Sequence, residues 1–428
     1  MIAREPTPIT LELGGVAASE LAEVYGTPLL VIDTDVLDSN IATYERIGRD
    51  SDIDVCYAGK ALLVVALARR IAASTLGLDV CSFGELLTGE AGGMRAERMV
   101  LHGCGKTRDE LSAALEGRVA RIVVDHLAEL HELGGLARNA RAHDERASLR
   151  VLLRVNTGIE ARTHAYVKTG GEASKFGFAP DDLPAAIALT QTIAGVELAG
   201  VHSHLGSQIF DAEPYAACVP ILLDAYETVL AAGAPGGELV LGGGFGVDSK
   251  PGGERIDTAT VIADVVRALR SSCAARGIAT PHVGIEPGRS LVADAGTSLY
   301  RVIAVKTQGT RRFAIVDGGI ADNPRPALYG AYHHPSLANR TSDARRVQTV
   351  VCGRSCENDV LVTTDLPSDL APDDVLALAT TGAYTYSMAS NYNRFAKPAI
   401  VFAGGGTHRA VVRRQSPSDL LCDDVIDA

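Results

Sequence analysis

The chain has 428 residues, and its 40 lysines and arginines are outnumbered by 52 aspartates and glutamates, which gives a net charge of −12. This length predicts two domains or one large barrel with an appended unit, and a hydrophobic content of 46% excludes a disordered chain. An acidic chain of this kind is a poor candidate for a nucleic-acid-binding protein, and the sequence predicts neither a signal peptide nor a membrane-spanning segment.

Short runs rich in β-branched residues alternate with longer helical stretches over the first two-thirds of the chain. Each run is separated from the next by the length of a helical crossover, which predicts a closed eight-stranded parallel (β/α) barrel. A doubly wound open sheet is the competing architecture. The eight expected strands are residues 52–58, 77–82, 98–103, 120–125, 149–156, 197–204, 238–243 and 282–286.

Beyond residue 295 the expected strands follow one another with turns between them and little helix, which predicts an all-β domain. A further strand-like stretch, residues 27–37, precedes the first barrel strand. We assign residues 37–295 to the barrel. Residues 1–36 together with 296–428 are expected to form a β-sandwich or barrel-like domain that completes the active site.

The eight cysteines are spread along the chain, and no pair has the C-x-x-C spacing of a zinc ribbon or a redox motif. Because no export signal is expected either, we predict reduced thiols and a cytoplasmic location.

The ends of the expected barrel strands carry polar residues of several kinds. In barrels of this type the chemistry lies at the C-terminal ends of the strands. An amine, imidazoles, a glycine-rich loop, a carboxylate and a guanidinium are therefore expected at one mouth. They are supplied by Lys60, His102, His204, the run GGGFG at 242–246, and the segment EPGR at 286–289.

Lys60 is a candidate nucleophile. Only seven of the 40 basic residues are lysines, and the apolar segment ALLVVALA follows Lys60 directly. A lysine in apolar surroundings loses its proton more readily and can attack an aldehyde as a free amine. Taken alone, Lys60 is better explained as a surface lysine at the start of a helix, and it is the scarcity of lysine that favours the nucleophile.

His202 and His204 form an H-x-H pair, whose side chains point the same way along a strand. Such a pair can present two metal ligands, but a third ligand at matching spacing is missing from the sequence. We therefore predict no metal site, and we expect one functional and one supporting histidine.

The glycine run GGGFG and the segment EPGR at the end of the last barrel strand have residues that can bind a phosphate and a nitrogen-containing ring. Glycines let backbone N–H groups approach a phosphate closely, although glycine-rich turns are common, and GGGFG matches neither a Walker sequence nor G-x-G-x-x-G. The carboxylate of Glu286 would hold a ring nitrogen in its protonated form. The planar fork of Arg289 would bind a phosphate or a substrate carboxylate.

A second polar cluster is expected in the β domain. The segment RPALYGAYH carries Arg325 and Tyr329, the segment CEND carries Cys356 and Glu357, and the segment GAYTYS carries Tyr384. Core tyrosines and a buried thiol would explain any one of these alone. Together they predict a second wall of one site.

Taken in order along the chain, these motifs resemble those of the fold-type III decarboxylases that use pyridoxal 5′-phosphate, and within that family they resemble the diaminopimelate decarboxylases. The resemblance runs from residue 25 to residue 393. The segments GSQ, SKFGF and RPALYGAYH favour the diaminopimelate branch over the ornithine/arginine branch. The motifs that carry the resemblance are YGTPLLVID, YAGKA, CSFGEL, HGCGKT, THAYVKTGGEASKFGF, GVHSHLGSQ, GGGFG, EPGR, RPALYGAYH, CEND and GAYTYSMASNYN.

The resemblance implies an alanine racemase-like barrel, the decarboxylation of meso-diaminopimelate to L-lysine in lysine biosynthesis, and a homodimer with shared active sites. Lys60 would hold pyridoxal 5′-phosphate covalently, His204 would stack on its ring, and Glu286 would pair with the ring nitrogen. The other residues implied to bind the cofactor are Gly243, Gly244, Gly288, Arg289 and Tyr384.

The resemblance also implies which residues bind the substrate and which residue protonates it after decarboxylation. Cys356 would protonate the carbanion that decarboxylation leaves, and both Cys356 and Glu357 would reach into the partner's site. Lys60, Cys356 and His204 are thus the implied catalytic residues, without a metal. The implied substrate-binding residues are Arg289, Arg325, Tyr329, Glu357 and Tyr384.

Several segments depart from the family's usual pattern. Cys104 and Gly105 stand where an asparagine pair is usual, the residues ADNP before Arg325 replace a more apolar stretch, and Thr385 replaces a common glycine. A paralogous decarboxylase that acts on a related amino acid or amino-acid conjugate is therefore the alternative. A non-catalytic regulator would lack Lys60 or the cysteine of CEND, and a racemase would lack the CEND acid, so the motifs argue against both.

Overall fold

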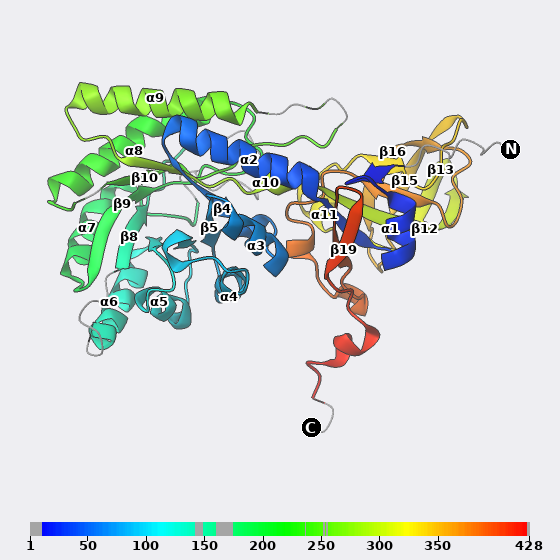
Figure 1. Cartoon of the computed structure of the whole chain (residues 1–428), viewed down its shortest axis with the longest axis horizontal. Helices are drawn as coiled ribbons and strands as arrows, with labels where there is room; N and C mark the ends of the chain where they lie inside the picture. Colours follow the sequence, from blue (N-terminus) through cyan, green and yellow to red (C-terminus); the bar gives the residue numbers. More distant parts are fainter. Residues whose placement is uncertain are drawn as a thin grey trace. The chain divides into compact units, whose positions relative to one another are not determined.

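The structure is a computed structural model that describes residues 11–141, 149–159, 174–235, 237–250, 253 and 256–425. The chain divides into two compact units (Figure 1). One, the barrel unit, comprises residues 41–247 and 254–291, and the other, the β unit, comprises residues 1–40, 248–253 and 292–428. Most of the motif THAYVKTGGEASKFGF lies outside the described residues.

The barrel unit is built on a closed parallel barrel of eight strands, in the order β10-β11-β4-β5-β6-β7-β8-β9. All eight strands expected from the sequence are present, and the closed barrel, not the open sheet, is confirmed. The strands are β4 (Asp54–Ala58), β5 (Gly77–Val80), β6 (Met99–Leu101), β7 (Arg121–Val124), β8 (Leu149–Arg154), β9 (Val196–His202), β10 (Glu238–Val240) and β11 (His282–Ile285).

Helices follow the strands and lie outside them (Figure 1). Local sequence explains where several of them begin and end. At the start of α5, Thr107 and Glu110 form a reciprocal capping box, and α9 begins after the capping side chain of Asp257 and ends at Gly277 in a left-handed conformation. The helices are α2 (Thr34–Ser51), α3 (Val65–Ala73), α4 (Phe83–Ala91), α5 (Arg108–Leu115), α6 (Leu127–Arg141), α7 (Leu183–Thr192), α8 (Glu213–Ala231), α9 (Thr258–Arg276) and the short α10 (Arg289–Val292).

The barrel strands are buried on both faces, which is why they read in the sequence as nearly continuous apolar runs. Small and medium side chains from six strands fill the interior, so the barrel is a packed core and not a pore. These side chains are Cys56, Val100, Val123, Leu152, Ala199 and Val240.

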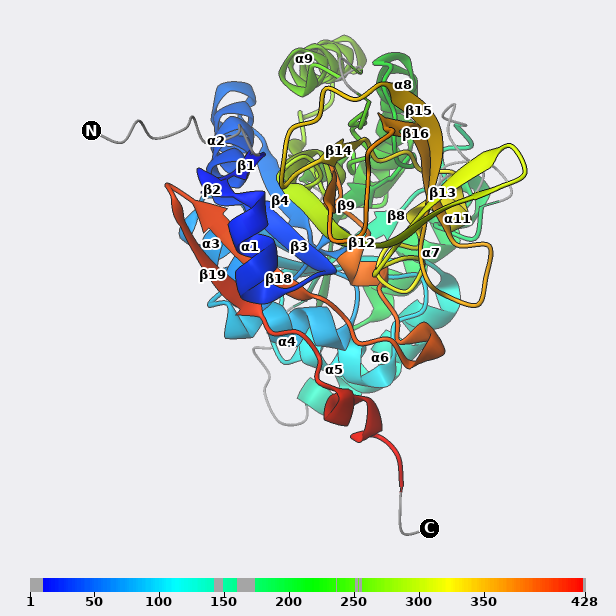
Figure 2. The same cartoon turned by 90° about the vertical axis from the view of Figure 1, so that its right-hand side faces the viewer.

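The β unit contains a nine-stranded sheet with the path β16-β15-β13-β12-β3-β18-β19, and β17 joins β12 to β14 (Figure 2). The N-terminal strand β3 lies between β12 and β18, because residues 29–32 pair with residues 296–299 and 29–33 pair with 399–403. The strands are β3 (Leu29–Asp33), β12 (Gly296–Gln308), β13 (Arg311–Val316), β14 (Pro335–Leu337), β15 (Arg346–Cys352), β16 (Val360–Pro367), β17 (Val375–Leu378), β18 (Ala399–Gly404) and β19 (Thr407–Val412).

The expected strands of the C-terminal region are thus present, and the region also holds the short helix α11 (Arg325–Tyr329). A small hairpin of β1 (Glu12–Leu13) and β2 (Val16–Ala17) and the helix α1 (Ala18–Tyr25) complete the unit. No helix in the described ranges has the length and apolar character needed to cross a membrane.

Candidate active site

The C-terminal ends of the barrel strands bring together the polar residues predicted in the barrel. Lys60 lies in a single 3-10 turn (Gly59–Ala61) directly after β4, and Glu286 directly follows β11. The strand β9 ends at His202, two residues before the expected end, so His204 lies in the loop. The segments that carry these residues are joined by backbone hydrogen bonds, from Ala58 N–H to the Pro287 oxygen at 3.0 Å and from Glu286 N–H to the Gly242 oxygen at 2.8 Å. The charges of Lys60, Arg154 and Glu286 all act on the pKa of His204.

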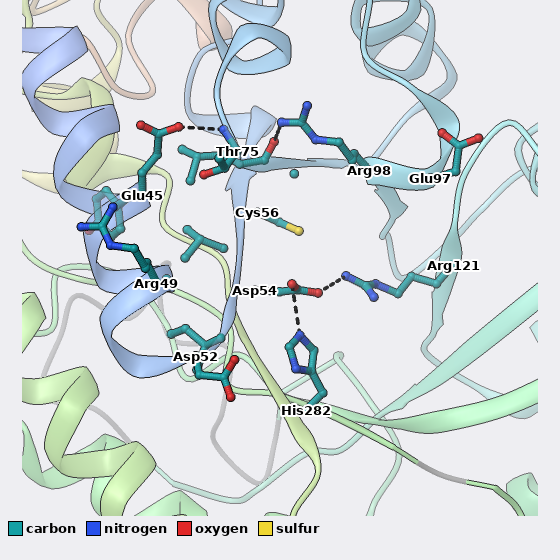
Figure 3. Close-up of a pocket in the computed structure, with 16 residues that line it drawn as sticks. Glu45, Arg49, Asp52, Asp54, Cys56, Thr75, Glu97, Arg98, Arg121 and His282 are labelled. Atoms are coloured by element: carbon teal, nitrogen blue, oxygen red, sulfur yellow. Dashed lines mark hydrogen bonds and ion pairs between the residues drawn. The ribbon is translucent and has the colours of Figure 1, made fainter.

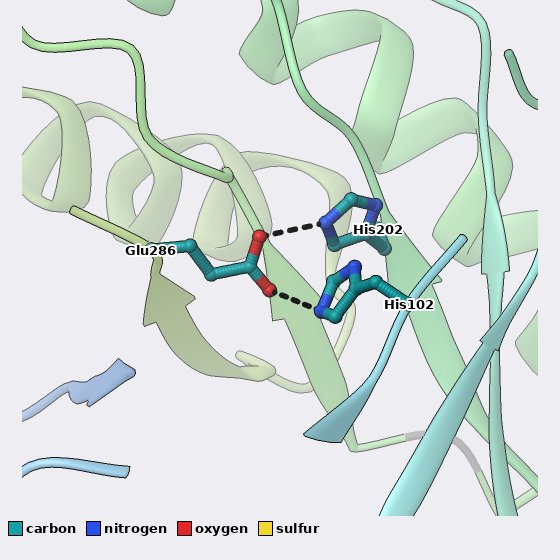
Figure 4. Close-up of side chains that lie close together, drawn as sticks. All are labelled: His102, His202 and Glu286. Carbon is teal, nitrogen blue, oxygen red and sulfur yellow. Dashed lines mark hydrogen bonds and ion pairs between the residues drawn. The ribbon is translucent and has the colours of Figure 1, made fainter. Parts of the chain in front are cut away.

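The carboxylate of Glu286 is held by two buried histidines (Figure 4). His202 Nε2 lies 3.0 Å from Oε2 in a hydrogen bond, and His102 Nε2 lies 3.0 Å from Oε1. The two imidazole rings meet edge to face, with centroids 4.9 Å apart. Burial alone would raise the pKa of Glu286, but the two histidines outweigh it and hold this pKa well below its usual range.

His102 also faces a second buried carboxylate. Its Nε2 atom lies 3.6 Å from Oδ1 of Asp79, which is the third residue of β5. Burial raises the pKa of Asp79 to about 6, and the neighbouring His102 and Lys60 act in the opposite direction. Asp79 was not predicted as a site residue, although the aspartate near the end of the second strand was visible in the sequence.

The imidazole of His204 is also restrained. Its Nδ1 atom accepts a hydrogen bond from the backbone N–H of Gly243 at 3.2 Å. Burial, followed by the charges of Lys60 and Arg154, lowers the pKa of His204 well below its usual value. A neutral ring that accepts at Nδ1 carries its proton on Nε2, so the structure fixes the tautomer as well as the position.

The glycine loop packs so closely against neighbouring backbone that larger residues would not fit. A Cβ atom on Gly243 would lie 2.0 Å from the backbone oxygen of Glu286, and one on Gly244, where φ is +99°, would lie 2.5 Å from that of Gly206. Nearby in the chain fold, the Nε and Nη2 atoms of Arg289 donate to Ser207 Oγ at 3.3 and 3.1 Å. The Ser207 hydroxyl and the Arg289 guanidinium, close to a glycine-rich loop, are donor types that a phosphate requires.

A buried ion network that the sequence did not reveal supports this end of the barrel. Lys106 Nζ lies 2.7 Å from Oε1 of Glu129, and both side chains are almost fully buried. The guanidinium of Arg154, at the end of β8, lies 3.7 Å from Asp125 and stacks over the ring of Phe176. The pairing partners come from different strands and loops, so no local sequence pattern indicates them.

In the β unit, three of the predicted substrate-binding residues form one cluster. Arg325 is buried at the start of α11, and its guanidinium carbon lies 5.0 Å from the ring centre of Tyr329 and 5.5 Å from that of Tyr384. Tyr384 has a φ of +60°, a conformation that non-glycine residues adopt rarely and often at functional sites.

Cys356 and Glu357 lie on the surface of the single chain. Cys356 is exposed, and its backbone N–H donates to Asn393 Oδ1 at 3.0 Å. The carboxylate of Glu357 accepts a hydrogen bond of 2.6 Å from the Tyr392 hydroxyl. The alternative explanation of Cys356 as a buried structural thiol is therefore wrong.

A cavity of the barrel unit lies at the other end, where the strands begin (Figure 3). It has a volume of about 690 Å³. Its charged groups pair with one another: Asp54 lies 3.1 Å from His282 and 3.4 Å from Arg121. Burial raises the pKa of the Cys56 thiol to about 12, which removes it as a nucleophile at neutral pH.

Three neighbouring residues also have the donor types of a metal site. One donor atom each from His102, His202 and Glu286 lies within 4.8 Å of the others. The H-x-H pair of the sequence is therefore not the relevant grouping, because His202 joins His102 and Glu286 from other strands. His202 Nε2 is hydrogen-bonded to one Glu286 oxygen, and His102 Nε2 lies 3.0 Å from the other oxygen as an ion-pair contact, so the three side chains contact one another directly.

Comparison with known proteins gives a consistent result. The family model described as "Pyridoxal-dependent decarboxylase, pyridoxal binding domain" matches residues 38–293. The diaminopimelate decarboxylase of Bacillus subtilis is 40% identical over 425 residues, covering 96% of this chain and 94% of that protein. The diaminopimelate decarboxylase of Actinosynnema pretiosum is 40% identical over 422 residues, covering 97% and 92%.

Solved structures agree with the curated relatives. The diaminopimelate decarboxylase of M. jannaschii in co-complex with L-lysine superposes with a TM-score of 0.87 at 28% identity, covering 97% of this chain and 98% of that one. An arginine decarboxylase of Paramecium bursaria Chlorella virus, at 18% identity and a TM-score of 0.77, shares the fold.

Proposed function

The chain belongs to the family of pyridoxal-dependent decarboxylases, and from this membership we propose that it uses pyridoxal 5′-phosphate to convert meso-diaminopimelate into L-lysine and carbon dioxide. The observation that carries the proposal is the identity of about 40% to diaminopimelate decarboxylases over nearly the whole of both chains. The convergence of Lys60, His204 and Glu286 at the barrel's C-terminal strand ends supports it.

The residues present suit this cofactor. The glycine loop would hold the phosphate together with Gly288 and Arg289, whose guanidinium and the neighbouring Ser207 hydroxyl are suitable donors. Lys60 would hold the aldehyde carbon, and the neutral ring of His204 would cover one face of the pyridine. When bound, pyridoxal phosphate supplies an electron sink for the electron pair that the departing carboxylate leaves behind.

Glu286 would keep a proton on the pyridine nitrogen, because the two histidines hold the pKa of its carboxylate well below the usual range. Tyr384 would contact both cofactor and substrate. Arg325, Tyr329 and Arg289 would bind the substrate, and the clustering of Arg325 with both tyrosines supports a common role for them. Positioning the scissile carboxylate is the main contribution expected of these groups.

We further propose that the protein works as a homodimer in which Cys356 and Glu357 serve the partner's site. Both residues are exposed in the single chain, which supports a role completed by a second copy. Cys356 would donate the proton that replaces carbon dioxide, as a general acid, and Glu357 would bind the distal amine of the substrate. The cytoplasmic location expected from the sequence stays a prediction.

The test is a substrate panel. The purified protein with pyridoxal 5′-phosphate is incubated separately with meso-diaminopimelate, lysine, ornithine and arginine, and carbon dioxide and amine products are measured. We expect equimolar lysine and carbon dioxide from meso-diaminopimelate, and no product from lysine, ornithine or arginine. Turnover of another amino acid without turnover of diaminopimelate would instead identify a paralogous decarboxylase, the alternative raised by the segment before Arg325.

A further inference from the structure

The three-residue group of His102, His202 and Glu286 does more than the proposed function asks of Glu286 alone. The three side chains come from the ends of three strands, β6, β9 and β11, that are far apart in the sequence. Each oxygen of the Glu286 carboxylate has its own imidazole Nε2 atom at 3.0 Å (Figure 4). Two contacts on two oxygens fix both the position and the rotation of a carboxylate.

The burial of the group explains why such restraint is needed. The exposed fractions are 7% for His102, 1% for His202 and 6% for Glu286. An ionised carboxylate removed from water to this degree is costly unless hydrogen-bond donors replace the water. The neighbouring Asp79 shows what happens when burial dominates, since burial raises the pKa of its carboxyl group to about 6.

Whether the groups that contact Glu286 are neutral or charged determines how strongly its carboxylate can still attract a cationic ring nitrogen. Burial lowers the pKa of His202 to about 4, so this ring is neutral at physiological pH and donates its Nε2 proton without a compensating positive charge. An arginine in the same place would neutralise the carboxylate. A neutral donor keeps Glu286 both ionised and available to a cationic ring nitrogen.

We propose that His102 and His202 are positioning residues that orient Glu286 and hold it ionised, so that it keeps the pyridine nitrogen of the cofactor protonated. The inference rests on the proposed function, because it needs the cofactor's ring to lie against Glu286. It assigns His202, the first histidine of the H-x-H pair, to the carboxylate and leaves His204 for the ring. The charged groups that also act on the site are Lys60, Asp79 and Arg154.

The experiment compares the whole enzyme, loaded with pyridoxal 5′-phosphate labelled with ¹⁵N in the ring, as wild type and as three variants. His202→Leu removes the donor, and His202→Gln keeps an N–H group near the same place. His131→Gln changes an exposed histidine on α6 and is the matched control. The ¹⁵N chemical shift reports directly whether the ring nitrogen carries a proton, which a merely structural role would not change.

We expect a protonated ring nitrogen in the wild type, in His131→Gln and in His202→Gln. In His202→Leu the resonance moves toward that of neutral pyridine, and kcat falls by about 10- to 100-fold, the range typical when a group that orients a primary ligand is lost. The KM for diaminopimelate changes by less than about threefold, because uniform substrate binding is untouched. We expect the same contrast at position 102: the ring nitrogen loses its proton and kcat falls in His102→Leu, whereas His102→Gln stays closer to the wild type.

Three results would overturn the proposal. One is a wild-type ring nitrogen without a proton, and another is an unchanged resonance and kcat in folded His202→Leu. The third is a stoichiometric metal ion in the purified wild type, which would make the group a metal site instead. A wild type that binds no cofactor would contradict the proposed function itself and is thereby distinguished. If His202→Leu fails to fold, as judged by circular dichroism, the comparison of His102→Leu with His102→Gln gives the same test.

Discussion

Cys356 is the residue on which the proposed proton transfer depends, and its exposure in the single chain separates it from the buried cysteines 56, 218 and 273. We predict that Cys356→Ala lowers kcat by about 10²- to 10⁴-fold, the range of general acid catalysis, and leaves the absorbance of bound cofactor unchanged. Steady-state kinetics and the visible spectrum measure both. Cys422→Ala, at another exposed cysteine, is the matched control and should behave as the wild type. Equal rates for the two variants would remove Cys356 from the reaction.

The residues of the barrel mouth differ in how far the sequence could indicate them. Lys60, His204 and Glu286 were predictable because each follows an apolar run that ends a strand, and barrel chemistry is located at such ends. The pairing of His102 and His202 with Glu286 was not, because it depends on how three strands from distant parts of the chain are arranged around a closed barrel. The same holds for Asp79, whose carboxylate reads in the sequence as an ordinary member of a strand.

Among the elements, the loop after β10 is sensitive to substitution because its glycines pack against backbone. We predict that Gly243→Ala weakens cofactor binding and lowers the free energy of unfolding by about 1–3 kcal/mol, because the added methyl group would lie 2.0 Å from the Glu286 backbone oxygen. Cofactor titration and denaturant unfolding measure the two effects.

The control for that substitution is Gly135→Ala on α6. There the nearest atom to an added Cβ is a side-chain nitrogen of Arg138 at 3.9 Å, an ordinary contact, and a helix interior favours alanine by up to about 1 kcal/mol. Gly135→Ala should therefore be as stable as the wild type or slightly more stable. Unimpaired cofactor binding in Gly243→Ala would show that this loop does not hold the cofactor's phosphate.

The existence of the strands was easier to predict than their ends. Strand β8 ends at Arg154 and β9 at His202, each two residues before the expected end. The next residue of each run, Val155 and Ser203, is still buried and still donates a backbone hydrogen bond to the neighbouring strand, so the sequence does not mark the exact end. The helix α11 was expected only as a polar segment, and its five residues are too few to show a helical period.

At the scale of the whole molecule, the assembly that we propose makes a strong prediction. Lys60→Ala and Cys356→Ala dimers should each retain at most about 1% of the wild-type activity. A mixture that exchanges subunits should regain activity, because a mixed dimer has one site with neither substitution. With equal amounts and free exchange, the recovery should approach about one quarter of the wild-type activity. Activity of the mixture that stays at the level of the separate variants would contradict a shared site.

The pH dependence of stability has an identifiable source in the β unit. Asp322 lines a cavity of about 250 Å³, and its carboxylate accepts hydrogen bonds from the Tyr300 hydroxyl at 2.5 Å and from the backbone N–H of Gly319 at 2.8 Å. Burial raises the pKa of Asp322 to about 7. An unfolded aspartate, with a pKa of about 4, releases its proton first, so this residue makes the folded state less stable as the pH rises from about 4 to about 7.

We therefore predict that Asp322→Asn gains stability relative to the wild type over that pH interval, and that the difference becomes constant above about pH 7. Denaturant unfolding of both proteins at several pH values between 4.5 and 8 measures it. Parallel stability curves for the two proteins would show that Asp322 is ionised throughout.

The pairing of strands that are far apart in the chain could not be predicted from the sequence. Strand β3 lies between β12 and β18, whose partner residues begin at positions 296 and 399, and nothing near residue 29 indicates them. The closed barrel was predictable because its strands pair largely with their neighbours in the chain. Such pairing needs no knowledge of distant sequence.

The most direct test of the central claim is the location of the cofactor's covalent bond. The protein loaded with pyridoxal 5′-phosphate is reduced with sodium borohydride, digested and examined by mass spectrometry. We predict a phosphopyridoxyl group on Lys60 and on no other lysine of the chain. A group on a different lysine, or an enzyme that makes lysine from diaminopimelate while Lys60 stays unlabelled, would contradict it.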